Sequence, residues 1–305
     1  MINDRLNLEV WRRLIRGESL NDLDLDISDG RVDLTGLQLP EPETLKRFQF
    51  AGGFFSKIKP AAEIRNVKWE NLDFTGSKLK SLRLFSCRLT NCRFDRCQME
   101  DLRVWDTTFK DCSFRGANLR DSALGPGMDS KRNIYLNVDF TETDLRGTNY
   151  NVALFEGCFF RNAKIKGIDF QTSAFVDCIF EGELNDVLFY SRGYEGEKYP
   201  ANEMINVDFS RATLRYVGFR GLTLDKVRFP KDENHLVFRD VVGTLNRLIE
   251  TLKRQGDEVA EQLVRYLDID RKHISPNQAQ AVINLQDLAD TFGSEAVARL
   301  RDLLG

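Results

Sequence analysis

The chain has 305 residues, of which 30% are charged, and its 44 Lys and Arg residues nearly balance 47 Asp and Glu residues, leaving a net charge of −3. This balance excludes a uniformly basic nucleic-acid binder and a strongly acidic chain. The sequence has no run of about 18 apolar residues and no secretory signal pattern at its N-terminus, so we expect a cytoplasmic protein without a membrane span.

Residues 1–19 predict a capping helix, since the segment NLEVWRRLIRG is amphipathic at helical spacing. We expect this helix to cover the open end of the segment that follows, because an exposed strand edge invites aggregation. The segment LPEPETLKRFQFAGGFFSKIKP then predicts a loop near residues 40–60.

Residues 20–232 are organised by a period of five residues. Every fifth residue from Ile64 to Leu124 is apolar, and after one slip the pattern resumes at Phe140 and reaches Phe229 with one deletion and one interruption. The residue two positions before each of these centres is never charged. This period fits neither a helix nor a flat strand. It fits a chain with a corner every five residues, so that four corners close a coil of about twenty residues that stacks on the next coil at about 4.8 Å.

The units CRFDR, CSFRG, VDFTE and IDFQT resemble those of the pentapeptide-repeat family, and the resemblance covers about residues 20–230. It implies a mainly β fold, a right-handed, four-sided parallel β-helix. Residues 233–305 change to helical periodicity and predict a C-terminal α-helical domain of about four helices, one of them beginning at Ser275-Pro276. The first two of these helices form a hairpin similar to those of tetratricopeptide repeats.

We identify no catalytic residues, no metal ligands and no cofactor site. All six cysteines occupy the small inward position, where Cys serves as a small buried hydrophobe, and Cys92 and Cys112 should stack on one wall, as should Cys158 and Cys178. Only two histidines are present, both outside the repeats, and no phosphate-binding glycine loop occurs. The sequence therefore predicts a protein that is not an enzyme.

One predicted outer face combines aromatic and basic residues, as binding hot spots do. Its members lie beside stacked centres, and we predict that they bind a partner: Arg83, Phe85, Arg103 and Trp105. The alternative is that the two aromatic rings stack on each other under a loop. If the coil count continues across the slip, Leu145 and Ile165 extend this face.

Two interruptions predict loops that project from the β-helix, GPGMDSKRNIY at 125–135 and YSRGYEGEKYPANEMI at 190–205. The arrangement is similar to that of quinolone-resistance proteins that protect DNA gyrase. In that group the rod resembles duplex DNA and the loops engage the topoisomerase. We predict partner contacts from these loop residues: Lys131, Arg132, Tyr190, Arg192, Tyr194 and Tyr199.

Three functions follow in order of preference. The first is a bacterial, DNA-mimic-like protector of a type II topoisomerase, DNA gyrase or topoisomerase IV, against poisons, and hence a cause of antibiotic resistance. The second is a protein-protein interaction scaffold whose C-terminal helices recruit a partner or form a homodimer. The third is direct nucleic-acid binding through the Arg and aromatic face, which the near-neutral charge disfavours.

Overall fold

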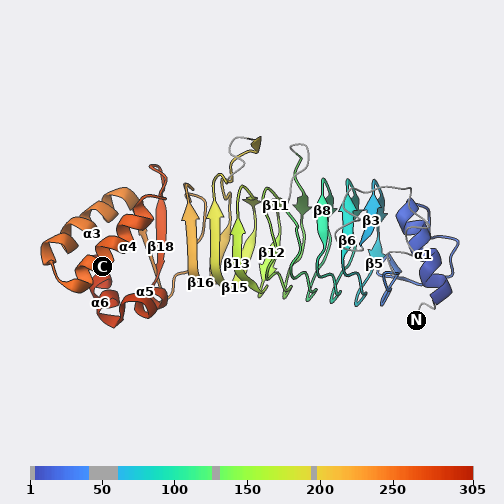
Figure 1. Ribbon diagram of the computed structural model, residues 1–305, viewed down its shortest axis with the longest axis horizontal. Coiled ribbons are helices and arrows are strands. Elements are labelled where there is room, and N and C mark those ends of the chain that lie inside the picture. Colours follow the sequence, from blue (N-terminus) through green and yellow to red (C-terminus); the bar gives the residue numbers. More distant parts are fainter. Residues whose placement is uncertain (1–3, 41–60, 126–130, 194–197, 305) are drawn as a thin grey trace.

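The computed structural model describes residues 4–40, 61–125, 131–193 and 198–304, which form a long rod with helices at both ends (Figure 1). No helix among these residues has the length and apolar character needed to cross a bilayer. The helices are α1 Asp4–Arg16, α3 Val241–Gln255, α4 Glu258–Arg271, α5 Leu285–Phe292 and α6 Ser294–Leu304.

The rod is a solenoid of short parallel strands. The strands of its described part are β2 Arg31–Asp33, β3 Ala62–Arg65, β4 Lys68–Glu70, β5 Leu72–Asp73, β6 Leu82–Phe85, β7 Arg88–Thr90, β8 Arg103–Trp105, β9 Thr108–Lys110, β10 Ile134–Leu136, β11 Leu154–Glu156, β12 Phe159–Arg161, β13 Ile165–Phe170, β14 Ala174–Val176, β15 Ile179–Tyr190 and β16 Asp208–Arg220. Where the repeats are unbroken, each residue pairs with the one twenty positions on, as in Ile64↔Leu84 and Phe155↔Phe175. This register stacks one coil directly on the next.

The pairings define four inner columns, which we call faces 1 to 4 in chain order starting from Trp69. Face 1 holds Trp69, Leu89, Phe109, Tyr135, Phe155 and Phe175. Face 2 holds Phe74, Phe94, Phe114, Phe140, Phe160, Phe180, Phe209 and Phe229. Face 3 holds Leu79, Met99, Leu119, Leu145, Ile165, Leu184 and Leu214. Face 4 holds Ile64, Leu84, Val104, Leu124, Tyr150, Phe170, Phe189 and Phe219.

Face 2 explains the abundance of phenylalanine, since 22 Phe stand against 7 Tyr in the chain. Its eight rings form one continuous stack, and ring centroids of successive members lie between 4.6 and 6.2 Å apart. Flat rings pile up at the spacing that strand pairing imposes, so Phe fills this column without voids.

The corners follow from backbone conformation. The residue two positions after a centre adopts the left-handed conformation along much of the rod, as at Asn66 (φ 57°), Asn71 (φ 55°) and Asp111 (φ 52°). Asn, Asp and Gly tolerate this conformation better than other residues. Their recurrence at this position is therefore what turns the chain every five residues.

The six cysteines line the inside of the rod, and all are free and buried. Each thiol donates to a backbone carbonyl 23 residues earlier, for example from Cys92 to Trp69 O at 3.5 Å and from Cys178 to Phe155 O at 3.5 Å. Burial raises the pKa of Cys97 to about 12, so its thiol stays protonated and unreactive at neutral pH. Among the described residues no cluster of three His, Cys, Asp or Glu could hold a metal ion.

At the N-terminal end, helix α1 packs on the first coil (Figure 1). Trp11 is fully buried and donates its indole N–H to Gln38 O at 2.8 Å. Trp69 of face 1 donates to Leu14 O at 3.1 Å, which joins the inner column to the C-terminal part of the helix. Between α1 and the regular coils, β1 Ile27–Ser28 forms a short antiparallel hairpin with β2.

At the other end, β17 His235–Arg239 and β18 Gln280–Asn284 form an antiparallel pair between the last coil and helices α3 to α6 (Figure 1). The buried His235 accepts at Nε2 from the backbone N–H of Leu214 at 3.1 Å, and its Nδ1 lies 2.8 Å from Asp232 Oδ1. The prediction of a helix beginning at Ser275-Pro276 is wrong, because residues 275–279 form turns and lead into β18. Hydrogen bonding to the end of the solenoid favours an extended segment there.

Candidate protein-interaction site

The two interruptions of the period leave the rod at the same corner, between face 4 and face 1. The first lies between Leu124 and Tyr135, since Tyr135 pairs with Phe109 although 26 residues separate them. The second follows Phe189 and ends at Met204, whose neighbour Ile205 pairs with Val176. We call this edge of the rod the loop corner.

A buried asparagine closes each interruption where the chain re-enters the rod. Asn133 is fully buried, donates to Val104 O at 2.8 Å and Leu124 O at 3.0 Å, and accepts from Thr107 N at 3.1 Å. Asn202 stands at the equivalent place, two residues before Met204, and its Oδ1 accepts from the Met204 amide at 3.0 Å. The two loop ends are therefore held rigidly by the core.

Arg132 joins the two interruptions across the corner. Its Nη2 donates to Pro200 O at 2.7 Å and to Thr172 O at 3.2 Å, and its guanidinium carbon lies 5.6 Å from the centroid of the Tyr199 ring. The backbone N–H of Gly193 donates to Thr172 Oγ1 at 2.7 Å. The described ends of both loops thus form one connected surface.

The corner between the loops is also strained. Val152 (φ 61°) and Thr172 (φ 56°) occupy the two left-handed turn positions at this corner between the loops. A β-branched residue in this conformation costs about 1–2 kcal/mol, whereas most other corners carry Asn, Asp, Gly or Ser. Strain of this kind concentrates at functional sites, which supports a role for this edge.

An apolar strip lies on the outside of face 1, next to the loop corner and between the two interruptions. It consists of outward side chains in two paired rows, Ile134, Leu154 and Ala174 in one, and Leu136, Val176 and Ile205 in the next, where Glu156 stands between Leu136 and Val176. Five of the six are half-buried and Ala174 is buried. On the earlier coils the same positions are Lys68, Arg88 and Thr108, and Glu70, Thr90 and Lys110.

Acidic side chains lie within and beside this apolar strip. Glu156 is exposed inside its second row, and Asp177 and Glu203 are exposed next to it. Apolar surface with a charged rim is typical of protein-protein interfaces. The sequence analysis missed the strip because it resumed the period at Phe140 and not at Tyr135. The apolar flanks of the centres in NIYLN, ALFEG and SAFVD were a usable signal.

The predicted Arg and aromatic face is assembled as expected, because Arg83 pairs with Arg103 and Phe85 with Trp105 in the β6–β8 register. The expectation that Phe85 is exposed is wrong, since its ring is 3% exposed. Trp105 stacks on Phe85 at 4.5 Å with an interplanar angle of 5°, and the Arg65 guanidinium lies 3.9 Å above Phe85.

The arginines of this face are engaged within the protein. Arg83 is 9% exposed and binds Asp101 Oδ2 at 2.7 Å, while Arg103 Nη2 binds Asp101 Oδ1 at 2.8 Å. Desolvation would raise the pKa of Asp101, but the hydrogen bonds from Arg83 and Arg103 outweigh it and hold the pKa below its ordinary value. These side chains stabilise the stacked coils and are poorly placed to contact phosphate.

Replacing Asp101 with Asn should destabilise the protein by about 2 kcal/mol at neutral pH, since hydrogen bonds to a charged group are worth about 1.5–3 kcal/mol. Because the folded-state pKa is depressed, this contribution is present above the unfolded-state pKa of about 4 and is lost as the pH falls through the folded value. Denaturant unfolding of both proteins from pH 7 downward should show the difference shrinking in acid. A difference that does not change with pH would contradict this assignment.

The predicted loop residues differ in placement. Lys131 is exposed and binds Asp106 at 2.9 Å, and Arg192 is exposed. The Arg220 guanidinium lies 6.0 Å from the Tyr190 ring centroid. Tyr199 is 2% exposed, so the expectation that it projects toward a partner is wrong, and its ring supports Arg132 instead. Tyr194 lies outside the described residues.

The expected continuation of the Arg and aromatic face is also wrong. Leu145 and Ile165 belong to face 3, since Asn118 pairs with Asp144 and Asp144 with Lys164. Face 4 continues from Leu124 to Tyr150, because Ala123 pairs with Asn149. The coil with the first interruption spans 26 residues instead of twenty. The later centres therefore lie one corner earlier than the sequence predicted.

Residues 137–182 match the family described as pentapeptide repeats, in eight copies. This segment of the rod therefore carries pentapeptide repeats. No curated protein matches the chain. Solved structures similar to it include full-length QnrB1, a plasmid-mediated fluoroquinolone resistance protein, at 18% identity, covering 61% of this chain and 91% of that chain with a TM-score of 0.26.

A second similar structure is HetL, a pentapeptide-repeat protein involved in heterocyst differentiation regulation in the cyanobacterium Nostoc sp. strain PCC 7120. It is 14% identical, and the match covers 55% of this chain and 85% of HetL with a TM-score of 0.21.

Proposed function

We propose that the protein is a non-enzymatic, cytoplasmic binding protein that docks on a type II topoisomerase, DNA gyrase or topoisomerase IV, and protects it from poisons. The observation that carries the proposal is the loop corner, where both interruptions leave one edge of a rigid rod and flank an apolar strip. A rod with residues fixed on one edge suits the recognition of a large protein surface.

We also propose the handedness of the rod and the bounds of its parts. Residues 20–232 form a right-handed, four-sided β-helix, residues 1–19 form an N-terminal cap and residues 233–305 form a C-terminal helical domain. The buried contacts of Trp11 and His235 support caps at the two ends. Caps of this kind keep the ends of a solenoid from pairing with other chains.

The partner should contact the loop ends and the apolar strip together. Arg132 makes the two loop ends one surface, and Ile134 and Leu154 lie directly beside it. The exposed carboxylates of Glu156, within the apolar strip, and of Glu203, beside it, favour a partner with basic residues, as a DNA-binding enzyme has near its active site.

The purified protein should reduce gyrase-mediated DNA cleavage in the presence of a fluoroquinolone. The double variant Leu154→Lys and Val176→Lys should need at least about tenfold more protein for the same effect, because charge replaces apolar contact area. Both side chains point outward, so the rod should stay folded, and circular dichroism melting checks this. Cleavage in the presence of the drug is the measurement.

Thr90→Lys is the matched control, since Thr90 is an outward residue of the same face outside the apolar strip. It should protect as the unmodified protein does. Protection by the double variant at unchanged concentration would show that the apolar strip is not the docking surface. No protection by the unmodified protein at several-fold molar excess would contradict the topoisomerase proposal itself.

A second candidate is a scaffold that recruits a partner, or forms a homodimer, through the C-terminal helices. The observation that favours it is apolar exposure there: Ile269 is 56% exposed and Val242 39% exposed. A negative result with gyrase would leave this candidate as the alternative. Nucleic-acid binding ranks below both, because Arg83 and Phe85 are buried within the rod.

A further inference from the structure

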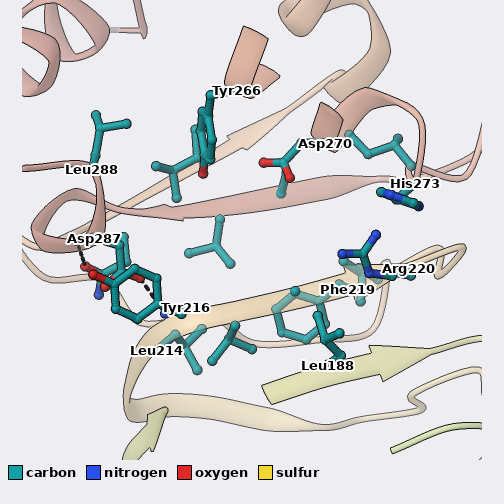
Figure 2. A pocket seen from close by; sticks show the side chains of 18 of the residues that line it. Leu188, Leu214, Tyr216, Phe219, Arg220, Tyr266, Asp270, His273, Asp287 and Leu288 are labelled. Atoms are coloured by element: carbon teal, nitrogen blue, oxygen red, sulfur yellow. Dashed lines mark hydrogen bonds between the residues drawn. The ribbon is translucent and has the colours of Figure 1, made fainter. Parts of the chain in front are cut away.

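A cavity of about 270 Å³ lies between the last coil of the rod and the helical domain (Figure 2). Its walls come from β16, the end of α4, β18 and α5. Two backbone hydrogen bonds fix these walls, from Gly221 to His273 O at 2.8 Å and from Ala279 to Thr223 O at 2.7 Å. The cavity is therefore preformed. Its volume lies just below the range of about 300–1,000 Å³ typical of small-molecule sites, which favours a ligand smaller than a nucleotide.

The wall that β16 contributes lacks a side chain at its centre. A Cβ on Gly218 would lie 2.6 Å from Leu188 Cδ2, so this glycine lets Leu188 lie flat against the strand. Leu188 and Gly218 are paired neighbours on β15 and β16. The apolar part of the lining includes Leu188, Phe219, Ile274, Val282, Leu288 and Phe292.

Two buried polar atoms of the lining have no hydrogen-bond partner in the part of the chain that the structure describes. One is the donor Nε of Arg220, and the other is the acceptor Oε1 of Gln278. Gln278 is only 7% exposed, and its amide nitrogen is already used by Gln280 O at 3.1 Å. A buried polar atom without a partner costs about 1–3 kcal/mol, so this lining is incomplete by itself. A ligand with both an acceptor and a donor would complete it.

A carboxylate and a guanidinium face each other across the same space. Figure 2 shows Asp270 of α4 and Arg220 of β16 on opposite walls, and within the described chain they form no ion pair. Desolvation raises the pKa of Asp270, and a hydrogen bond with Tyr266 and the charges of Arg220 and His273 oppose this only in part. A cation between these walls would therefore stabilise the ionised carboxylate.

We propose that this cavity binds a small zwitterion, an aliphatic α-amino acid. Its carboxylate pairs with Arg220, its ammonium group lies between Asp270 and Gln278 Oε1, and its side chain packs on Leu188 and Phe219. The ligand would contact both the rod and the helical domain and so stabilise their junction by mass action. This site is independent of the loop corner and of the topoisomerase proposal.

Calorimetric titration of the full-length protein with L-leucine should show saturable binding, accompanied by a rise in the melting temperature. N-acetyl-L-leucine lacks the ammonium group and L-leucinamide lacks the carboxylate, so each should bind at least about tenfold more weakly than L-leucine. Equal binding of all three compounds, or no binding of any of the twenty amino acids, would overturn the proposal. The second result would mean that the cavity holds only water.

Two variants separate this site from general effects on stability. Arg220→Gln should weaken L-leucine binding by about tenfold or more. Gln278→Leu should weaken it too, and because the variant loses the hydrogen bond to Gln280 O but also removes an unsatisfied acceptor, it should stay folded. Arg211→Gln is the control, since Arg211 lies on the same strand with its side chain 78% exposed. Unchanged affinity in both cavity variants would also overturn the proposal.

Discussion

Replacing Phe155 with Ala should destabilise the protein by about 3–5 kcal/mol, the usual cost of removing a fully buried aromatic ring. Phe155 is 0% exposed and stacks between Tyr135 at 4.8 Å and Phe175 at 5.1 Å. Its ring also meets Phe160 of face 2 at 5.6 Å, so the cavity would open at the meeting point of two columns. Neighbouring coils are held in register by strand pairing and cannot collapse into it.

Denaturant unfolding measures this loss, and Phe159→Ala provides the comparison. Phe159 lies four residues after Phe155 and points outward. It is half-buried, and the Arg161 guanidinium lies 4.5 Å from its ring centroid. Its removal should cost less than about 1 kcal/mol. Similar losses for the two variants would mean that the inner column does not dominate stability.

Replacing Asn133 with Leu should cost about 2 kcal/mol or more. The variant keeps the size of the side chain but removes the partners of one backbone carbonyl and one backbone N–H, and each such buried group costs about 1–3 kcal/mol. The carbonyl belongs to Val104 and the N–H to Thr107, whereas Leu124 O keeps its hydrogen bond from the Tyr135 hydroxyl at 2.7 Å. Hydrogen exchange at the Thr107 amide should rise with the loss of stability.

Lys131→Ala is the matched control for this prediction. Lys131 is two residues away, its side chain is 63% exposed, and its ion pair with Asp106 is a surface contact. Its loss should change stability by less than about 1 kcal/mol. If Asn133→Leu is no more destabilising than this control, then Asn133 does not hold the end of the first loop.

Much of the rod could be predicted from the sequence, because inward residues recur every five positions and each needs an apolar or small side chain. Trp69, Leu89 and Phe109 fall on one inner column as their spacing requires. The register across the first interruption could not be predicted. Tyr135 is preceded two residues earlier by the polar Asn133, and only the three hydrogen bonds made in the folded state make that residue acceptable inside the rod.

Only part of the candidate site could be predicted, because its geometry also depends on the register across the interruptions. The two interruptions of the period could be identified, but their common corner depends on the register across them, which the repeat pattern does not show. Phe85 was predicted to be exposed because its position is an outward one, yet stacking with Trp105 and the guanidinium of Arg65 covers its ring. Ser275-Pro276 matched a local signal for a helix start, and pairing of β18 with β17 favoured the strand that follows.

The stacking of coils fixes distances along the axis of the rod. The coils that begin at Tyr135, Phe155 and Phe175 lie between the two interruptions, so the loops are separated along the axis by about 14 Å, three spacings of about 4.8 Å. This distance can change only in steps of one coil, because a smaller change in length is absorbed within a coil, as in the 19-residue step from Ile165 to Leu184 between the loops. A partner that contacts both loops therefore meets a spacing that single-residue insertions and deletions do not adjust.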